Sequence, residues 1–431
     1  MRLNWMQLKN FRCFETLDIT FKERMSVIVG INGAGKSSVL DAASIAIGSM
    51  LLGIDGVWSS GILSDDVRYV SYHAGSKLDL QPQFPVTITA DGELQGEEVR
   101  WSRSLRGENG KTTSVDAKQL SNISANMQKK IRRGNMSVVI PLISYYSTGR
   151  LWAKRHQKKS GLKHIQSTGR FSGYFGCLDT KANEQLLMKW FEEMTMIELQ
   201  ERRTIPELSA VRGAIEKFYT RMTNHTNVEF HFRLATKMLE FEYTNEYGDR
   251  CKVPLKDLSD GYQNTLNMIA DIAYRMATLN PQLLENVIEE TPGIVLIDEV
   301  DLHLHPTWQQ RILHDLMEIF PKVQFIVTTH APAVIQSIQT ESLIILDHSQ
   351  TFEPPIPTYG RDANSVLSII MGTSTRPKEV QDKFKELDNA LSESDLEKAR
   401  VLLSGLEDQI GDGDPDLIAA RISLELEEWE D

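Results

Sequence analysis

The sequence has few cysteines and no long hydrophobic run. Its three cysteines are widely spaced among 431 residues and form no CxxC pair, which argues against a disulfide framework or a cysteine metal site. We expect all three thiols to be reduced and buried. The longest apolar stretches, such as residues 39–54, are interrupted by polar residues or glycine and stay short of the ~18 consecutive apolar residues of a membrane span. The N-terminus lacks the apolar segment of a signal peptide, so we expect a cytoplasmic protein without a membrane partner.

Basic residues are outnumbered, since the net charge is −12, but the charge is unevenly distributed. Residues 378–431 carry 17 Asp and Glu against 6 Lys and Arg, which leaves the remaining chain at −1. Residues 129–170 carry 11 Lys and Arg and no acidic residue. An acidic total argues against nucleic acid as a partner, but this segment permits a local basic surface.

Strand patterns alternate with helical patterns along most of the chain, which predicts an α/β fold with a mainly parallel sheet. Helical periodicity over residues 183–223 indicates an inserted helical lobe. Residues 376–429 indicate two or three further helices. The predicted strands cover residues 3–12, 17–21, 25–29, 84–105, 137–144, 228–234, 238–243, 294–297, 324–328 and 343–346.

Residues 30–37 read GINGAGKS and fit the phosphate-binding pattern GxxxxGK[ST] between an apolar strand and a helix. Glycines let successive backbone N–H groups converge on phosphate, and the helix N-terminus adds a favourable field. Lys36 would reach the β- and γ-phosphates of ATP, and Ser37 would hold Mg²⁺. The residues predicted to bind the nucleotide here are Asn32, Gly33, Gly35, Lys36, Ser37 and Ser38.

Residues 293–299 read GIVLIDE, an apolar strand that ends in two carboxylates. We predict that Asp298 binds Mg²⁺ directly or through water, and that Glu299 is the general base for the attacking water. The alternative is an ordinary core strand that leads into an acidic turn. The phosphate loop upstream argues against that alternative.

A third segment brings the chain to a resemblance with the ABC-type ATPases of the SMC, RecF and OLD kind. Residues 258–263, LSDGYQ, are similar to the LSGGQ signature and depart from it at Asp260 and Tyr262. The resemblance implies that the signature of one chain completes the ATP site of another, in a head-to-tail dimer or a higher homo-oligomer. The signature residues that it assigns to nucleotide binding are Ser259, Gly261 and Gln263.

Two further residues match this family. His330, in the segment VTTH, resembles the switch histidine that senses the γ-phosphate, and Asp301 matches the nucleotide-contacting D-loop position. Residues 145–150 are the best candidate for a Q-loop, in which Arg150 would approach phosphate or nucleic acid, although an ordinary surface arginine is an equal alternative. The basic residues 154–159, with aromatic residues on both sides, fit either nucleic-acid contact or a solvated loop.

The resemblance extends over most of the chain to the stand-alone ATPases of bacterial antiphage operons, most of all the ATPase of Septu systems and its retron-associated relatives. It rests on the segments NFRCFE, YYSTGRLW, GRFSGYFGCLD, LSDGYQNTLNMIADIAYRMATLNP, VLIDEVDLHLHPTWQQ and FIVTTHAP. It implies an ATPase that acts as a regulatory or sensor scaffold for a separate effector, such as an HNH nuclease. No nuclease motif is evident in this chain. A RecF-like DNA-repair ATPase is the alternative, and a slowly hydrolysing ATP clamp is a third.

The family implies an ABC-type P-loop head with an antiparallel β subdomain, an inserted helical lobe and a C-terminal helical tail. We accordingly assign the head to residues 1–150, with the phosphate loop, and 226–350, with the signature, the acidic strand end and His330. Residues 151–225 hold the basic segment and the helical lobe, and residues 351–431 form the acidic tail.

Overall fold

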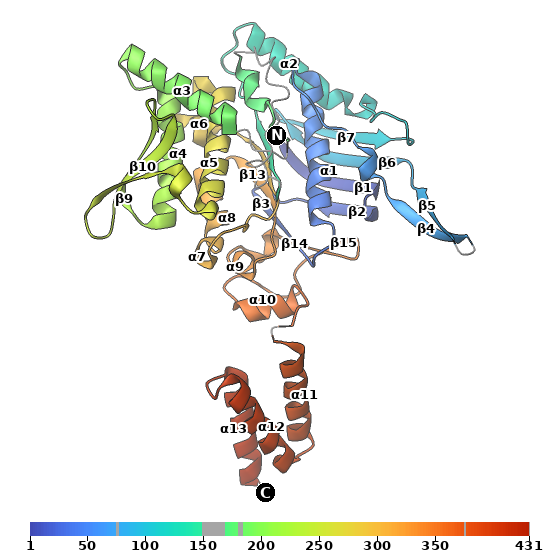
Figure 1. Cartoon of the computed structure of the whole chain (residues 1–431). Helices are drawn as coiled ribbons and strands as arrows, with labels where there is room; N and C mark the ends of the chain where they lie inside the picture. Colours follow the sequence, from blue (N-terminus) through green and yellow to red (C-terminus); the bar gives the residue numbers. More distant parts are fainter. Residues whose placement is uncertain (75–76, 149–168, 180–183, 375, 431) are drawn as a thin grey trace. The chain divides into compact units, whose positions relative to one another are not determined.

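The computed structural model describes residues 1–74, 77–148, 169–179, 184–374 and 376–430. The chain divides into two compact units, Met1–Ala363 and Asn364–Asp431 (Figure 1). The residues that we assigned to the head and to the inserted lobe fall in the first unit. The basic residues 154–159 and the Q-loop candidate Arg150 lie outside the described residues.

The first unit is built on a six-stranded sheet with the order β15-β14-β3-β13-β12-β8. All neighbouring strands are parallel except β15, which runs antiparallel to β14. Strands β3, β8, β12 and β13 are buried at every position, as expected for parallel strands that are covered on both faces. The strands are β3 (Met25–Val29), β8 (Leu142–Tyr146), β12 (Gly293–Ile297), β13 (Val323–Thr328), β14 (Leu343–Asp347) and β15 (Gln350–Phe352).

A four-stranded antiparallel sheet with the order β2-β1-β6-β7 forms the β subdomain. Its strands are β1 (Arg2–Phe11), β2 (Phe14–Thr20), β6 (Val86–Leu94) and β7 (Glu97–Leu105). Helix α1 (Lys36–Gly48) contacts strands of both sheets (Figure 1). The indole N–H of Trp101 on β7 donates to the carbonyl oxygen of Ala46 at 2.9 Å and ties the helix to the antiparallel sheet.

Several helices lie on the side of the six-stranded sheet away from the β subdomain (Figure 1). Helix α4 (Pro206–Thr223) packs against α5 (Asp260–Leu279), α8 (Ile312–Ile319) and a three-stranded antiparallel sheet. That sheet consists of β9 (Thr226–Arg233), β10 (Met238–Thr244) and β11 (Arg250–Pro254). The other helices and strands of this unit are α2 (Lys118–Arg132), α3 (Glu184–Glu201), α6 (Val287–Glu290), α7 (Pro306–Gln309), α9 (Pro332–Ile335) and the hairpin of β4 (Tyr69–Ala74) and β5 (Lys77–Pro82). The observed arrangement confirms the predicted α/β class.

Several elements differ from the predicted ones. Strand β8 begins at Leu142, five residues after the predicted start at Ser137, and proline explains the difference because Pro141 has no N–H to donate to a neighbouring strand. Helix α2 lies in a stretch where no helix was predicted. Leu120, Ile123, Met127 and Ile131 recur at the spacing of an amphipathic helix, so the sequence does carry a signal for α2, within a stretch that is otherwise mostly polar. Strands β4, β5 and β11 also lie outside the predicted strands.

The second unit contains α10 (Ala363–Ile369) and three longer helices that share a core. The three longer helices are α11 (Lys378–Ser392), α12 (Leu396–Ile410) and α13 (Pro415–Glu430). Arg376, before α11, pairs with Asp414 at 2.8 Å and Asp416 at 2.5 Å at the start of α13. The buried core residues are Val380, Leu387, Ala390, Ala399, Leu403, Leu406, Leu417, Ala420 and Leu424. None of the helices in the described ranges of either unit combines the length and hydropathy that a bilayer crossing requires.

Candidate nucleotide-binding site

The order of the parallel strands determines where the predicted motifs meet. Strand β13 lies between β3 and β12, so the loops after all three strands open at the same edge of the sheet. A cleft of about 360 Å³ lies at this edge, within the usual range of small-ligand sites. The residues that line it are Arg12, Cys13, Asn32, Gly33, Gly35, Lys36, Ser37, Ser38, Asp298, Glu299 and His330.

The phosphate loop follows β3 directly and requires glycine for two different reasons. Gly35 has a φ of 98°, in the left-handed region, and a β-carbon there would approach the Cys13 sulfur to 2.7 Å. At Gly30, a β-carbon would overlap the carbonyl oxygen of Leu346 on β14. Helix α1 begins at Lys36, and the N–H groups of its first turn lack intrahelical partners, as an anion site requires.

Lys36 is 6% exposed, and its ammonium is held by the loop that it follows. Its Nζ donates to the carbonyl oxygens of Gly30 at 2.9 Å and Ile31 at 3.0 Å. Burial lowers the pKa of Lys36, and the carboxylates of Asp298 and Glu299 act in the opposite direction. A phosphate bound here would offer the ammonium a charged acceptor in place of neutral carbonyl groups, which is the stronger kind of hydrogen bond.

The two carboxylates after β12 share a partner on the neighbouring strand. The Thr328 hydroxyl donates to Oδ1 of Asp298 at 2.6 Å and accepts from the backbone N–H of Glu299 at 2.8 Å. Glu299 has a φ of 48°, a left-handed conformation that is uncommon for residues other than glycine. Thr328 therefore fixes both the Asp298 carboxylate and the strained turn that aims Glu299.

His330 follows β13 and lines the cleft, as predicted from the sequence. Burial lowers its pKa, and the nearby Lys36 lowers it further, while Asp301 and Asp298 raise it. The imidazole is therefore neutral near pH 7, with both hydrogen-bond roles available. Asp301 is not among the residues that line the cleft, and its Oδ1 accepts from the Thr329 hydroxyl at 2.5 Å.

The signature segment lies outside this cleft. Ser259 is the exposed residue at the N-terminus of α5, and Gln263 donates its amide to the carbonyl oxygens of Lys256 at 2.8 Å and Leu258 at 2.5 Å. Gly261 packs so closely that a β-carbon would overlap the His303 carbonyl oxygen. The structure thus brings together the predicted residues of the phosphate loop, the acidic strand end and His330. Ser259, Gly261, Gln263 and Asp301 do not line the cleft, but Asp301 lies near enough to raise the pKa of Lys36 and of His330.

Two cleft residues were not predicted as site residues. Arg12, at the end of β1, extends to Asp41 on α1 at 2.6 Å and to Asp66 at 2.8 Å. Cys13 is exposed in the cleft, so the expectation that all cysteines are buried is wrong at this position. Cys177 is buried and Cys251 is partly buried. Both cleft residues belong to the β subdomain, and sequence patterns do not indicate which residues of another sheet reach the phosphate loop.

Two residues near the basic segment 154–159 have internal roles. They are Arg170, the last residue of the basic stretch 129–170, and Tyr174, one of the aromatic residues that follow it. Arg170 donates to the carbonyl oxygens of Leu279 at 2.7 Å and Val138 at 2.8 Å. Tyr174 is 1% exposed and donates its hydroxyl to the Pro141 carbonyl oxygen at 2.5 Å, so it cannot stack on a base. Residues 149–168 lie outside the described residues.

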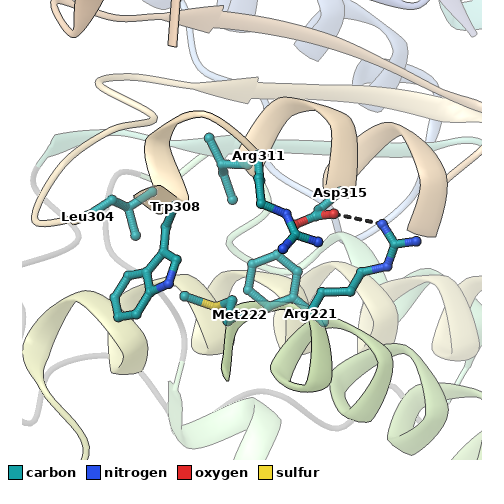
Figure 2. A pocket seen from close by; sticks show the side chains of 8 residues that line it. Arg221, Met222, Leu304, Trp308, Arg311 and Asp315 are labelled. Carbon is teal, nitrogen blue, oxygen red and sulfur yellow. Dashed lines mark hydrogen bonds and ion pairs between the residues drawn. The ribbon is translucent and has the colours of Figure 1, made fainter. Parts of the chain in front are cut away.

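A second, smaller pocket lies where α4 packs against α7 and α8 (Figure 2). Figure 2 shows the guanidinium of Arg221 paired with Asp315 at one end of the pocket and Trp308 at the other. The Arg221 Nη1 and Asp315 Oδ1 atoms are 2.7 Å apart. The volume of this pocket is about 10 Å³, enough for one water at most. We therefore assign it to helix packing and not to ligand binding.

The sheet order, the glycine loop before α1 and the acidic end of β12 define a P-loop nucleotide-binding protein. A protein-family model described as an AAA domain matches residues 6–223. The chain therefore belongs to the AAA-domain family. A second AAA-domain model, whose description refers to the AbiEii toxin of type IV toxin–antitoxin systems, matches residues 180–336.

Several relatives resemble this chain. The Retron Ec83 probable ATPase of Escherichia coli is 28% identical over 495 aligned residues, which cover 100% of this chain and 88% of the relative. The Septu protein PtuA of Bacillus mycoides (strain KBAB4) is 38% identical over 111 residues, 26% of this chain and 14% of the relative. The SMC head domain from Thermotoga maritima aligns with a TM-score of 0.41 and 20% identity over 81% of this chain and 97% of that structure. The first two matches confirm the predicted resemblance to the retron and Septu ATPases.

Proposed function

We propose that this chain binds and hydrolyses ATP as the ATPase of an antiphage system of the retron or Septu type, and that it controls a separate nuclease. The observation that carries the ATPase part is the single cleft that contains Lys36, Asp298 and Glu299. A phosphate-binding lysine, a metal-binding carboxylate and a base at one sheet edge are the parts that phosphoryl transfer to water requires.

The phosphate loop, Glu299 and His330 have distinct roles in this proposal. The N–H groups of residues 33–37 and the Lys36 ammonium hold the β- and γ-phosphates. Glu299 orients and deprotonates the attacking water, and the neutral imidazole of His330 bonds to the γ-phosphate.

Mg²⁺ fits the oxygen donors at the cleft. The Ser37 hydroxyl, in the first turn of α1, and the Asp298 carboxylate, which is 3% exposed, both line it. Few protein ligands suffice, because Mg²⁺ in such sites keeps waters and phosphate oxygens as its other ligands. When bound, the ion would neutralise charge on the phosphates. Thr328 holds Asp298 in one orientation for this role.

The exposed position of Ser259 supports a composite site. Ser259 begins a 20-residue helix, and neither it nor Gly261 lines the cleft of its own chain. In a head-to-tail pair, the N-terminus of α5 from a second copy would approach the γ-phosphate and complete each site. We therefore propose a homodimer as the smallest hydrolytic unit.

The second unit is our candidate docking surface for the nuclease. Residues 378–431 have a net charge of −11, and the three helices have a core of their own. Proteins that bind DNA usually present basic surfaces, which an acidic helical unit complements. The ATPase relatives named above support ATP hydrolysis by this chain. Control of a nuclease is a separate part of the proposal.

Two substitutions test the ATPase. Lys36→Ala should abolish nucleotide binding, and Glu299→Gln should retain ATP while stopping hydrolysis and accumulating an ATP-bound dimer. Equilibrium binding of a fluorescent ATP analogue and mass photometry measure both effects. Unchanged ATP affinity in Lys36→Ala would exclude this cleft as the nucleotide site.

Co-purification from the native operon, with mass measurement in the presence and absence of ATP, tests the partner. A stable complex with the product of a neighbouring nuclease gene is the expected result. Hydrolysis by the isolated chain that DNA stimulates, without any co-purified protein, would instead favour a DNA-repair ATPase of the RecF type.

A further inference from the structure

Two adjacent tyrosines at the end of β8 connect the phosphate-loop helix to the signature helix. Tyr145 and Tyr146 are 4% and 5% exposed. Successive side chains of a strand point to opposite faces of the sheet, so the two hydroxyls extend to different helices. The strand that carries them pairs with β12, and the Asp298 N–H donates to the Tyr146 carbonyl oxygen at 2.8 Å.

On one face, Tyr145 bonds to the helix that follows the phosphate loop. Its hydroxyl donates to Oδ1 of Asp41 on α1 at 2.7 Å. The other carboxylate oxygen of Asp41 accepts from Arg12, which lines the nucleotide cleft, at 2.6 Å. The Asp41 carboxylate thus holds Arg12 and Tyr145 together, and Tyr145 joins the cleft wall to β8.

On the other face, Tyr146 bonds to the signature helix. Its hydroxyl donates to Oδ2 of Asp271 on α5 at 2.7 Å. The same oxygen accepts from Arg275, one turn further along α5, at 2.6 Å. Asp271 and Arg275 are 5% and 2% exposed, so this pair lies in a low-dielectric interior where each hydrogen bond matters.

A second connection joins the same two elements through the segment after residue 169. Arg275 donates to the carbonyl oxygens of Gly173 at 2.8 Å and Phe175 at 2.9 Å. The N–H of Tyr145 donates to the carbonyl oxygen of Cys177 at 2.8 Å, so this segment lies along the outer edge of β8. The signature helix is therefore held to β8 both by a side-chain hydroxyl and by two clamped carbonyl groups.

Burial keeps both tyrosines in the donor form. It raises the pKa of Tyr145, and the neighbouring Asp41 raises it further. Burial raises the pKa of Tyr146 in the same way, with Asp271 as the next cause. Both hydroxyls therefore remain protonated wherever the protein is folded, and the connection does not depend on pH in the neutral range.

We propose that Tyr146 is a positioning residue for ATP hydrolysis: with Tyr145 it fixes α5, and so the signature segment at its N-terminus, relative to the nucleotide cleft. The proposal rests on the proposed function, because the signature acts only on ATP in a composite site. ATP binding within one chain does not use α5, whereas hydrolysis requires the signature to meet the γ-phosphate of the other chain. Loss of the Tyr146 hydroxyl should therefore lower kcat and leave ATP affinity unchanged.

Tyr146→Phe in the full chain tests this, with Ser124→Ala as the control. Ser124 on α2 is also buried, and its hydroxyl donates to the carbonyl oxygen of Met50 at 2.7 Å, outside the segments that connect β8 to α5. We expect Tyr146→Phe to lower kcat by about tenfold or more, since small misplacements of a catalytic element have effects of this size. Its ATP dissociation constant should stay within about twofold of wild type, and Ser124→Ala should change neither value.

Equal kcat values for Tyr146→Phe and Ser124→Ala would overturn the proposal, as would a loss of ATP affinity that accounts for the whole effect. If Tyr146→Phe does not fold, Arg275→Lys, which loses the fork that reaches both carbonyl groups, is measured in the same way.

Failure of the proposed function has a different signature. In that case wild type hydrolyses ATP no faster than Glu299→Gln. The position of α5 is then measured by hydrogen exchange of residues 259–263. Faster exchange in Tyr146→Phe than in Ser124→Ala supports the connection, and equal exchange overturns it.

Discussion

At the scale of single residues, the Thr328 hydroxyl decides how the acidic end of β12 is arranged. It bonds at once to the Asp298 carboxylate and to the Glu299 backbone. Mutation of groups that orient metal ligands typically lowers metal affinity or activity about 10- to 100-fold. Thr328 touches neither nucleotide nor metal in our proposal, so it acts only through its two neighbours.

Thr328→Val should separate orientation from binding. Valine keeps the β-branched shape of a buried strand residue and removes only the hydroxyl. We expect kcat to fall about 10- to 100-fold with little change in ATP affinity, because the phosphate loop is untouched. Steady-state hydrolysis and ATP-analogue binding measure the two. Thr223→Val, which removes a hydroxyl bonded within α4, is the control, and a similar fall there would contradict the role of Thr328.

The pH dependence of hydrolysis should report His330. Burial and the Lys36 ammonium lower the pKa of His330 from its ordinary 6.5, so the free protein holds a neutral imidazole above that pH and gains the proton only below it. Because kcat/KM reports the free protein, it should stay level from neutral pH down to the ordinary histidine range and fall below that range. His330→Gln should lose this acidic limb. An unchanged limb in His330→Gln would assign it to another group.

At the scale of elements, the helices of the second unit depend on their shared core. Leu406 on α12 is fully buried among residues of all three helices, whereas Val401 on the same helix is 74% exposed. The short helices of this unit are marginal by themselves and need tertiary packing.

Leu406→Ala should therefore destabilise the second unit by about 2–5 kcal/mol, the usual effect of a large-to-small change in a core. Hydrogen exchange of residues 378–430 in the full chain measures the effect, with Val401→Ala as the control. ATP affinity should not change, because every cleft residue belongs to the first unit. Equal exchange in the two variants would show that the three helices do not form one cooperative core.

Element boundaries followed from sequence where the pattern was local. The strand Met25–Val29 matches its predicted bounds because a contiguous apolar run before a glycine-rich turn defines it. The predicted start of β8 was wrong. The residues before it are apolar, but Pro141 has no N–H to donate to a neighbouring strand. Helix α2 was missed although Leu120, Ile123, Met127 and Ile131 follow helical spacing, because most other residues of the stretch are polar.

At the scale of the whole molecule, the separation of Ser259 from the cleft makes a specific prediction about mixtures. Lys36→Ala retains an intact signature, and Ser259→Arg retains an intact phosphate loop. Each variant alone should be inactive. In a head-to-tail dimer, an equal mixture should recover about a quarter of the wild-type rate, since half of the dimers are mixed and each has one complete site.

A mixture of Lys36→Ala with Glu299→Gln is the matched control. Both changes affect the same half of the site, so no pairing of these chains restores a complete one. Steady-state hydrolysis after equilibration measures both mixtures. Recovery in the control, or none in the first mixture, would contradict the composite site.

The sequence by itself determined the phosphate loop, the acidic strand end and the α/β class. Each depends on a contiguous pattern: a strand, a glycine turn and a helix, or an apolar run that ends in two carboxylates. Only the tertiary structure decided that Thr328 joins Asp298 to Glu299, and that Arg12 and Cys13 line the cleft. The pairing of β13 between β3 and β12 unites segments about 300 residues apart, and no local pattern specifies such register.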